Sequence, residues 1–188
     1  MEKILQWDTA IFRLINSTGS NSFSDWITPF LRNPLTWYPL YLFLLLFAAI
    51  NYKKNGWWWV AFCAITVIMA NYISSGIMKP TFNRLRPCNV PEYSSWINIL
   101  VHRPQNGSFT SSHAANHFGF AMYFYMTLKQ NFAKWKPALF FVWAIAICYA
   151  QVYIGIHYPL DIIGGAIIGI VIGYLWATVF NRKFTLLA

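Results

Sequence analysis

Two residues that can do chemistry together stand in a stretch where charge is scarce. His157 and Asp161 are four residues apart in the segment that runs from Gln151 to Asp161. Pro159 suits the first turn of a helix, which places the Asp161 carboxylate where it can reach back to an N–H of His157. A histidine held in one tautomer by a carboxylate is suited to act as a base or a nucleophile. A purely structural pair that caps the helix is the alternative interpretation.

A second polar cluster lies immediately before an uncharged apolar run and contains Ser111, Ser112 and His113. Serine in this place is typical of a helix N-cap, where free backbone N–H groups and the positive helix end favour an anion such as phosphate. His113 and His117 share a helical spacing and could be interpreted as a metal or haem pair. No cysteine or carboxylate stands near them in the sequence, so we expect no metal and no cofactor.

A third cluster contributes positive charge. Lys79, Arg84 and Arg86 fall within eight residues, and Pro80 and Pro87 follow the first and the last of them. Because proline disfavours helical geometry in the residue before it, Lys79 and Arg86 are expected at chain bends from which both can turn toward one ligand. Cations that extend toward the membrane interface at helix ends are the alternative.

Together these clusters predict phosphoryl transfer without a metal. Cations and backbone N–H groups would hold the phosphate oxygens, one histidine would attack phosphorus, and the other would protonate the leaving group.

The composition indicates where such a site would lie. Of 188 residues, 57% are hydrophobic and only 10% are charged, against about 25% charged in an average soluble domain. We therefore expect an integral membrane protein. The formal net charge of +9 fits loop residues that fix orientation together with a site for anions. The basic residues form no stripe or run, so nucleic acid is not an expected partner.

Apolar windows predict an all-α, polytopic membrane bundle. A spanning helix needs about 20 mostly apolar residues, and about five windows qualify. They are Leu35–Tyr52, Gly56–Met78, Ser111–Leu128, Pro137–Leu160 and Ile162–Phe180. In the last of them Gly165, Gly169 and Gly173 are four residues apart, a spacing that indicates close packing against a neighbouring helix and no chemistry.

The remaining segments complete a single membrane-embedded domain, residues 1–188. Residues 1–32 alternate apolar and polar positions and are interrupted at Ser17–Ser20, which predicts one or two amphipathic helices in the interface. They lack the features of a cleavable signal peptide. Residues 80–110 form the long loop, in which several prolines prevent a continuous helix, and loops of that length are usually functional or disordered.

Five spans that alternate sides bring the three clusters to one face of the membrane. The basic residues divide almost evenly between the two faces, but those opposite the clusters occupy two short loops and the C-terminal segment. These are Lys53, Lys54, Lys129, Lys134, Lys136, Arg182 and Lys183. They are the better cytoplasmic set, so the site is expected to face the periplasm or exterior of a bacterial inner membrane.

At this point the residues resemble the type 2 phosphatidic acid phosphatase family of membrane lipid phosphatases. Its K-x6-R-P pattern is met by Lys79, Arg86 and Pro87. Its P-S-G-H pattern is met by Ser111 and His113, with Thr110 and Ser112 at the other two positions. Its S-R-x5-H-x3-D pattern is met by His157 and Asp161, with Ala150 and Gln151 where Ser and Arg are expected.

The resemblance implies a role for each residue. His157 would be the nucleophile that forms a phosphohistidine, Asp161 would orient it, and His113 would be the general acid. The implied phosphate-binding residues are Lys79, Arg86, Ser111, Ser112 and Gln151. A glutamine gives a neutral amide where the family has a bidentate cation, so we expect that contact to be weaker or to be supplied by Arg84 or Arg103.

The function expected from the resemblance is hydrolysis of a phosphomonoester or pyrophosphate headgroup of a membrane lipid. The candidate substrates are undecaprenyl pyrophosphate, phosphatidylglycerol phosphate, phosphatidic acid and lipid A phosphate. The departures at Ala150 and Gln151 motivate an alternative, a catalytically weakened binder or carrier of lipid phosphates.

Overall fold

The computed structural model describes residues 2–186, so residues 1, 187 and 188 of the expected domain lie outside the described part. Its regular elements are all helical, as predicted. They are α1 (Glu2–Arg13), α2 (Ser22–Arg32), α3 (Tyr38–Asn71), α4 (Lys79–Phe82), α5 (Ser112–Leu128), α6 (Trp135–Tyr153) and α7 (Pro159–Lys183). Short π-helical or 3₁₀ turns lie at Leu14–Thr18, Pro34–Trp37, Tyr72–Met78, Pro87–Asn89 and Pro91–Tyr93.

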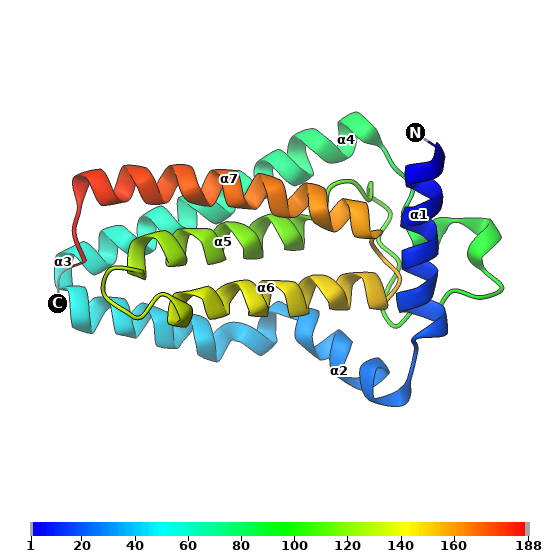
Figure 1. The fold of residues 1–188 in the computed structure, drawn as a ribbon, viewed down its shortest axis with the longest axis horizontal. Helices are drawn as coiled ribbons and strands as arrows, with labels where there is room; N and C mark the ends of the chain where they lie inside the picture. The colour runs from blue at the N-terminus through cyan, green and yellow to red at the C-terminus, as the bar shows by residue number, and fades with distance from the viewer. Residues whose placement is uncertain (1, 187–188) are drawn as a thin grey trace.

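The α3 segment consists of two helical arms joined at a reversal. Lys53 has φ 48°, outside the helical region, and at the reversal a side chain on Gly56 would overlap the carbonyl of Ala48. Figure 1 shows the chain turning back here, at the end of the bundle where the C-terminus lies. The expected boundary between Leu35–Tyr52 and Gly56–Met78 therefore falls at this turn.

Within residues 2–186, three segments are long and apolar enough to cross a membrane: Pro34–Tyr93, which contains both arms of α3, Trp135–Tyr153 and Pro159–Lys183. The expected third span corresponds to α5, which has 17 residues and is about 25 Å long at 1.5 Å per residue. A hydrocarbon core is about 30 Å thick, so α5 alone falls short of it. The helices support an integral membrane protein, and the number of five spans stays a prediction.

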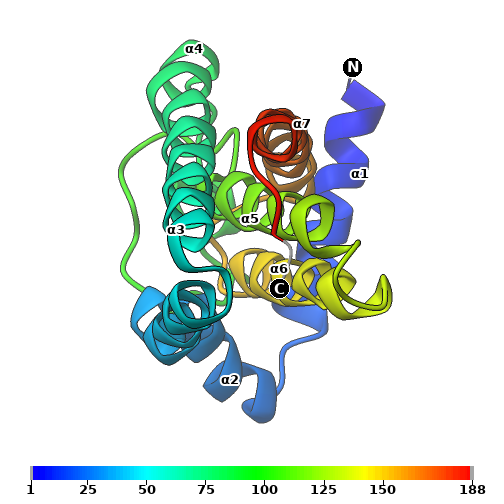
Figure 2. The same cartoon turned by 90° about the vertical axis from the view of Figure 1, so that its left-hand side faces the viewer.

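Helix α5 lies at the centre of the bundle, with α3, α6 and α7 around it (Figure 2). Its closest neighbour is α7. Side chains at Gly165, Gly169 and Gly173 would overlap the carbonyl oxygens of Ser111, Ala115 and Gly119 on α5. The prediction of close helix packing is confirmed, because backbones approach this closely only where side chains are absent.

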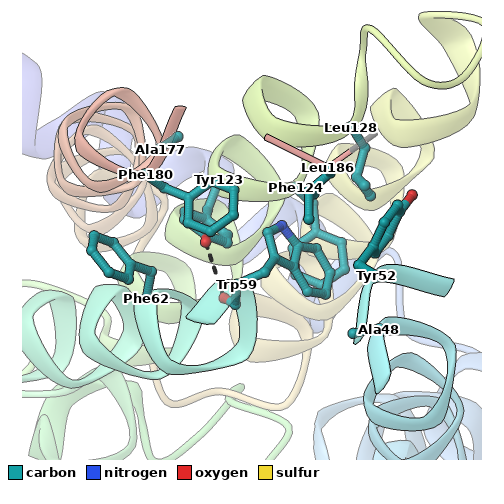
Figure 3. Packing of buried hydrophobic residues seen from close by; sticks show 10 residues of the cluster. All are labelled: Ala48, Tyr52, Trp59, Phe62, Tyr123, Phe124, Leu128, Ala177, Phe180 and Leu186. Carbon is teal, nitrogen blue, oxygen red and sulfur yellow. Dashed lines mark hydrogen bonds between the residues drawn. The ribbon is translucent and has the colours of Figure 1, made fainter. Parts of the chain in front are cut away.

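An aromatic cluster fills the core between α3, α5 and α7. Trp59, Tyr123, Phe124 and Phe180 are almost completely buried there. Figure 3 shows the Tyr123 hydroxyl donating to the carbonyl of Trp59, at 3.0 Å, and the Trp59 indole donates to Thr127 Oγ1 at 2.8 Å. The core therefore satisfies the polar ends of its aromatic side chains, as burial requires.

The polar segments gather at the other end of the bundle. Figure 1 shows that α5 and α7 begin there, that α6 ends there, and that α1 crosses that end. The three clusters therefore meet at one end of the bundle, where Arg86 contacts His157 and the Ser111 N–H donates to the carbonyl of Asp161. The interrupted N-terminal pattern is also confirmed as two helices, α1 and α2, separated by Leu14–Thr18 and a short connection.

One expectation about the chain bends was wrong. Lys79 has φ −61° and ψ −48°, so it is helical in spite of Pro80, and the helix ends only at Asn83, which has φ 41°. The π-helical turn at Tyr72–Met78 precedes the proline, and such wider turns accommodate the missing N–H and the bulk of the ring. Arg86 has φ −70° and ψ 150° before Pro87, so the expected bend is present there.

Candidate active site

The centre of the candidate site is His157, in the short connection between α6 and α7. Its side chain is 2% exposed and lies between two partners. Nδ1 is 3.4 Å from Asp161 Oδ2, and Nε2 is 3.1 Å from the Arg86 guanidinium. Because arginine can only donate, Nε2 must accept, which puts the imidazole proton on Nδ1. This tautomer directs the Nε2 lone pair away from Asp161, as a nucleophile requires.

Burial also controls the charge of His157. It lowers the pKa of His157 to about 4, the positive charges of Arg86 and Lys79 act in the same direction, and the hydrogen bond to Asp161 opposes them. The imidazole is therefore neutral near pH 7. A neutral imidazole keeps the lone pair that attack on phosphorus needs.

Asp161 is held by more donors than the sequence indicated. Its Oδ2 accepts hydrogen bonds from the Ser108 hydroxyl and from the Tyr158 backbone N–H, at 2.8 Å from the latter, and its Oδ1 accepts from Arg84 at 2.8 Å. Ser108 is completely buried. Sequence reasoning missed its role, since nothing in the loop pattern distinguishes Ser108 from its polar neighbours. The carboxylate is thus fixed by its surroundings and can fix His157 in turn.

Arg84 joins the N-terminal helix to this network. The terminal nitrogen Nη2 of Arg84 donates to Asp8 Oδ2 at 2.6 Å, and the Leu160 N–H donates to Asp8 Oδ1 at 2.8 Å. The guanidinium also stacks on the Tyr158 ring, 3.9 Å from its centroid. Both donor groups of Arg84 are therefore committed to carboxylates. Asp8 was another missed residue, because the sequence of α1 reads as an amphipathic surface helix.

The loop before α5 positions Arg86. Its Nε donates to the carbonyl of Asn106 at 2.9 Å, one terminal nitrogen donates to Asn106 Oδ1 at 2.8 Å, and the other to the carbonyl of Ile156 at 3.0 Å. Lys79 is 7% exposed, and its ammonium group forms no hydrogen bond or ion pair with any of residues 2–186. A buried cation without a counter-charge is costly, so this amine is suited to hold an anion.

The N-terminus of α5 has the expected cap. Ser111 is the N-cap, its Oγ accepts from the Ala114 N–H at 3.4 Å, and its own N–H donates to the carbonyl of Asp161 at 2.9 Å. Within residues 2–186 the N–H groups of Ser112 and His113 have no acceptor. These are the free donors that a phosphate at a helix N-terminus would use. The Ser112 hydroxyl itself pairs with Ser75 Oγ at 2.7 Å.

The two α5 histidines have different environments. The His113 ring makes no hydrogen bond with the described residues, whereas His117 Nδ1 donates to the carbonyl of His113 at 2.8 Å. The rings stack with centroids 6.1 Å apart. Across the described residues, no three His, Cys, Asp or Glu side chains are grouped as a metal site would need. Among the described residues both ring nitrogens of His113 are therefore available to a ligand, whereas His117 has only Nε2 available.

Gln151 is the least explained of the expected site residues. Its side chain is completely buried in the last turn of α6, yet neither amide atom has a hydrogen-bond partner among residues 2–186. A buried amide without partners carries a desolvation cost that a bound oxygen would offset. Arg103, one of its two suggested substitutes, is exposed, and Arg84 is held by Asp8 and Asp161.

Similarity to known proteins agrees with this geometry. The chain is 30% identical over 185 residues to the lipid A 4'-phosphatase of Bacteroides thetaiotaomicron, covering 93% of this chain and 77% of that protein. It is 27% identical over 179 residues to the undecaprenyl-diphosphatase of Sulfolobus acidocaldarius, covering 93% and 79%.

Solved structures show the same fold. The crystal structure of Aquifex aeolicus LpxE superposes with a TM-score of 0.68 at 28% identity, over 90% of this chain and 94% of that one. A phosphatidylglycerolphosphate phosphatase from Bacillus subtilis superposes with a TM-score of 0.74 at 17% identity, over 98% and 89%. The family model described as the PAP2 superfamily matches residues 59–185, which include Lys79, Arg86, His113, His157 and Asp161. This match covers most of the chain, and the chain therefore belongs to the PAP2 superfamily.

Proposed function

We propose that this protein is a metal-independent phosphatase that hydrolyses the phosphate or pyrophosphate headgroup of a membrane lipid. The observation that carries the proposal is the buried His157, held in one tautomer between Asp161 and Arg86. Unpaired donors lie around it on Lys79 and at the N-terminus of α5. The relatives named as lipid A 4'-phosphatase and undecaprenyl-diphosphatase support this class of substrate.

The proposed mechanism has two steps. His157 Nε2 attacks phosphorus, the bond from phosphorus to the leaving oxygen breaks, and His113 gives that oxygen its proton. Water then attacks the phosphohistidine, with His113 taking a proton from it, and inorganic phosphate leaves.

Arg86 has a specific part in the first step. In the free protein it occupies the Nε2 lone pair of His157, at 3.1 Å. A phosphate is the stronger acceptor, so substrate binding transfers this donor to a phosphate oxygen and frees the nucleophile. Lys79, Ser111, Gln151 and the free N–H groups of Ser112 and His113 complete the set of donors around the transition state.

The membrane arrangement is part of the proposal. Five segments would cross the bilayer: the two arms of α3, then α5, α6 and α7. Residues 1–32 would lie in the interface, and residues 80–110 would form the extracytoplasmic active-site loop of a bacterial inner-membrane protein. The headgroup would then reach the site from the outer leaflet while the lipid chain stays in the bilayer.

The test is phosphate release from a panel of lipid phosphates by purified protein in detergent with EDTA, beside His157→Ala and His113→Ala. We expect release by the wild type, none by His157→Ala, and an alkali-stable phosphoryl label on the wild type, as a phosphorus–nitrogen bond gives. Equal, low release by wild type and His157→Ala would overturn the proposal. If the protein still bound a non-hydrolysable lipid phosphate, the binder or carrier would be the better description.

A second variant tests the family departure at Gln151. We expect Gln151→Arg to give no gain in turnover, because Lys79 and Arg86 already supply two cations to the proposed site. A gain of about tenfold or more, the value of a charged hydrogen bond, would show that the glutamine limits the enzyme.

A further inference from the structure

A cavity beside His113 has chemistry that the proposed mechanism does not use. Its volume is about 510 Å³, and its lining includes Arg32, His113, Asn116 and Trp143. The nucleophile His157 does not line it, and neither do Lys79 or Arg86. The cavity therefore lies on the side of the general acid, where the leaving group of the reaction would be.

Arg32 brings an unmatched positive charge to this cavity. It ends α2, and it forms no hydrogen bond or ion pair with any of residues 2–186. Burial lowers the pKa of its guanidinium, although arginine stays charged at any physiological pH. A partly buried guanidinium with five N–H donors and no acceptor suits an anion that comes from outside the chain.

Two more polar groups, on residues that line the cavity, lack partners. The indole Nε1 of Trp143 and the side-chain oxygen of Asn116 are buried without a hydrogen bond to the described residues. Such groups are rare in folded proteins because each carries a desolvation cost. Trp143 and Arg32 both offer donors that suit a ligand rich in oxygen atoms, whereas the Asn116 oxygen is an acceptor and pairs only with a donor such as a hydroxyl.

Most of the remaining cavity wall is apolar or aromatic, and its other polar residues are Asn71, Ser112 and His117. Trp37, Tyr41, Cys63 and Phe120 form much of it, and the first three come from the segment that leads into and along α3. The apolar part of this wall suits a hydrocarbon chain. The cavity thus combines an anion site with a surface for a lipid chain.

We propose that this cavity holds an anionic leaving group, so that the preferred substrate is a lipid diphosphate and Arg32 determines that preference. The inference rests on the proposed function. In an in-line transfer the nucleophile and the leaving oxygen lie on opposite sides of phosphorus. With His157 on one side, the leaving group lies on the side of His113 and Arg32.

The chemistry of the leaving group then separates the two substrate classes. When His157 attacks the terminal phosphorus of a diphosphate, the bond to the bridging oxygen breaks and a lipid monophosphate leaves, with a proton from His113. The negative charge that remains on the lipid monophosphate pairs with Arg32. A phosphomonoester instead releases a neutral alcohol, which has no use for a guanidinium.

The experiment compares farnesyl diphosphate with farnesyl monophosphate, two probes with the same hydrocarbon chain, on wild type, Arg32→Gln and Arg32→Lys. We expect wild type to prefer the diphosphate, and Arg32→Gln to lower kcat/KM for it by about 10- to 100-fold, the value of a charged hydrogen bond. The loss on the monophosphate should stay below roughly threefold on the same scale, and Arg32→Lys should recover part of the activity. Arg182→Gln, at an exposed arginine in the last turn of α7, is the matched control.

A binding measurement protects the test against a folding defect. Farnesyl monophosphate is the product of the diphosphate reaction, so its inhibition constant should rise in Arg32→Gln while that for inorganic phosphate does not. Equal losses on the two substrates, or a wild type that prefers the monophosphate, would overturn the inference and leave the proposed function intact. Hydrolysis that persists in His157→Ala would instead overturn the proposed function itself.

Discussion

Ser108 provides the sharpest test of how the site is held together. Asp161 Oδ2 faces the Ser108 hydroxyl, the Tyr158 N–H at 2.8 Å and His157 Nδ1 at 3.4 Å. In Ser108→Ala the carboxylate loses one of its two close Oδ2 donors and is free to turn toward Arg84. A hydrogen bond to a charged group contributes about 1.5–3 kcal/mol, and about 1.4 kcal/mol corresponds to a factor of ten. We therefore expect kcat to fall by about 10- to 100-fold, with KM nearly unchanged.

The assay is steady-state phosphate release in detergent, with the unfolding temperature measured in parallel. Ser95→Ala is the matched control, because Ser95 lies in the same loop with an exposed side chain. Ser108 acts through Asp161, so the loss should appear in kcat while phosphate binding stays intact. A variant with unchanged or increased kcat would refute the reasoning, since it would mean that Ser108 does not orient Asp161 or that it competes with His157 for Oδ2.

Four further outcomes follow from the packing and the charge states. Burial lowers the pKa of His157 from 6.5 to about 4, so its imidazole NMR signal should titrate near pH 4. The signal can be assigned by its loss in His157→Gln. A titration midpoint near pH 6.5 would contradict the burial of this side chain. Between these two values the unfolded chain binds a proton that the folded chain does not, so stability should fall as the pH falls through that window, as denaturation at several pH values would reveal. Gly169→Leu should force α7 away from α5 and lower the free energy of unfolding by about 1–3 kcal/mol, measured as a lower unfolding temperature. Ile167→Ala, at a position 58% exposed on the same helix, is the control and should cost less. Equal costs for the two variants would contradict close packing of α7 on α5. Thr127→Val removes the acceptor of the buried Trp59 N–H and should destabilise the core by about 1–3 kcal/mol in the same measurement, and an unchanged unfolding temperature would mean that water replaces the threonine.

Much of the fold could be predicted because it depends on local pattern. Apolar windows without charge favour helices that cross or line a bilayer, and their boundaries lie close to those of α5, α7 and the two arms of α3. The window Pro137–Leu160 was too long, because α6 ends at Tyr153 and the connection that holds His157 follows it. The close packing at the α7 glycines could also be predicted, since their spacing puts them on one face of a helix. Local rules failed at Lys79, where a π-helical turn accommodates Pro80 and keeps the chain helical.

The candidate site likewise contains residues that the sequence could identify and residues that it could not. The pair His157 and Asp161 is four residues apart, so its geometry follows from one loop and one helix turn. Ser108, Asp8 and Asn106 are far in sequence from the residues they support, by 53 positions for Ser108 and Asp161. Serine, aspartate and asparagine are ordinary in polar segments, so the sequence does not distinguish these three from their neighbours.

The sequence by itself therefore determined the helical architecture, the family and the residues proposed for the reaction centre, because each depends on composition or on short spacings. Only the tertiary structure decided which groups fix Asp161, that Arg84 is committed to Asp8 and Asp161, and that Arg32, beside His113, has no partner among residues 2–186. The physical reason is that a charge is neutralised by whatever the fold brings within about 4 Å of it, and that pairing depends on how distant segments pack.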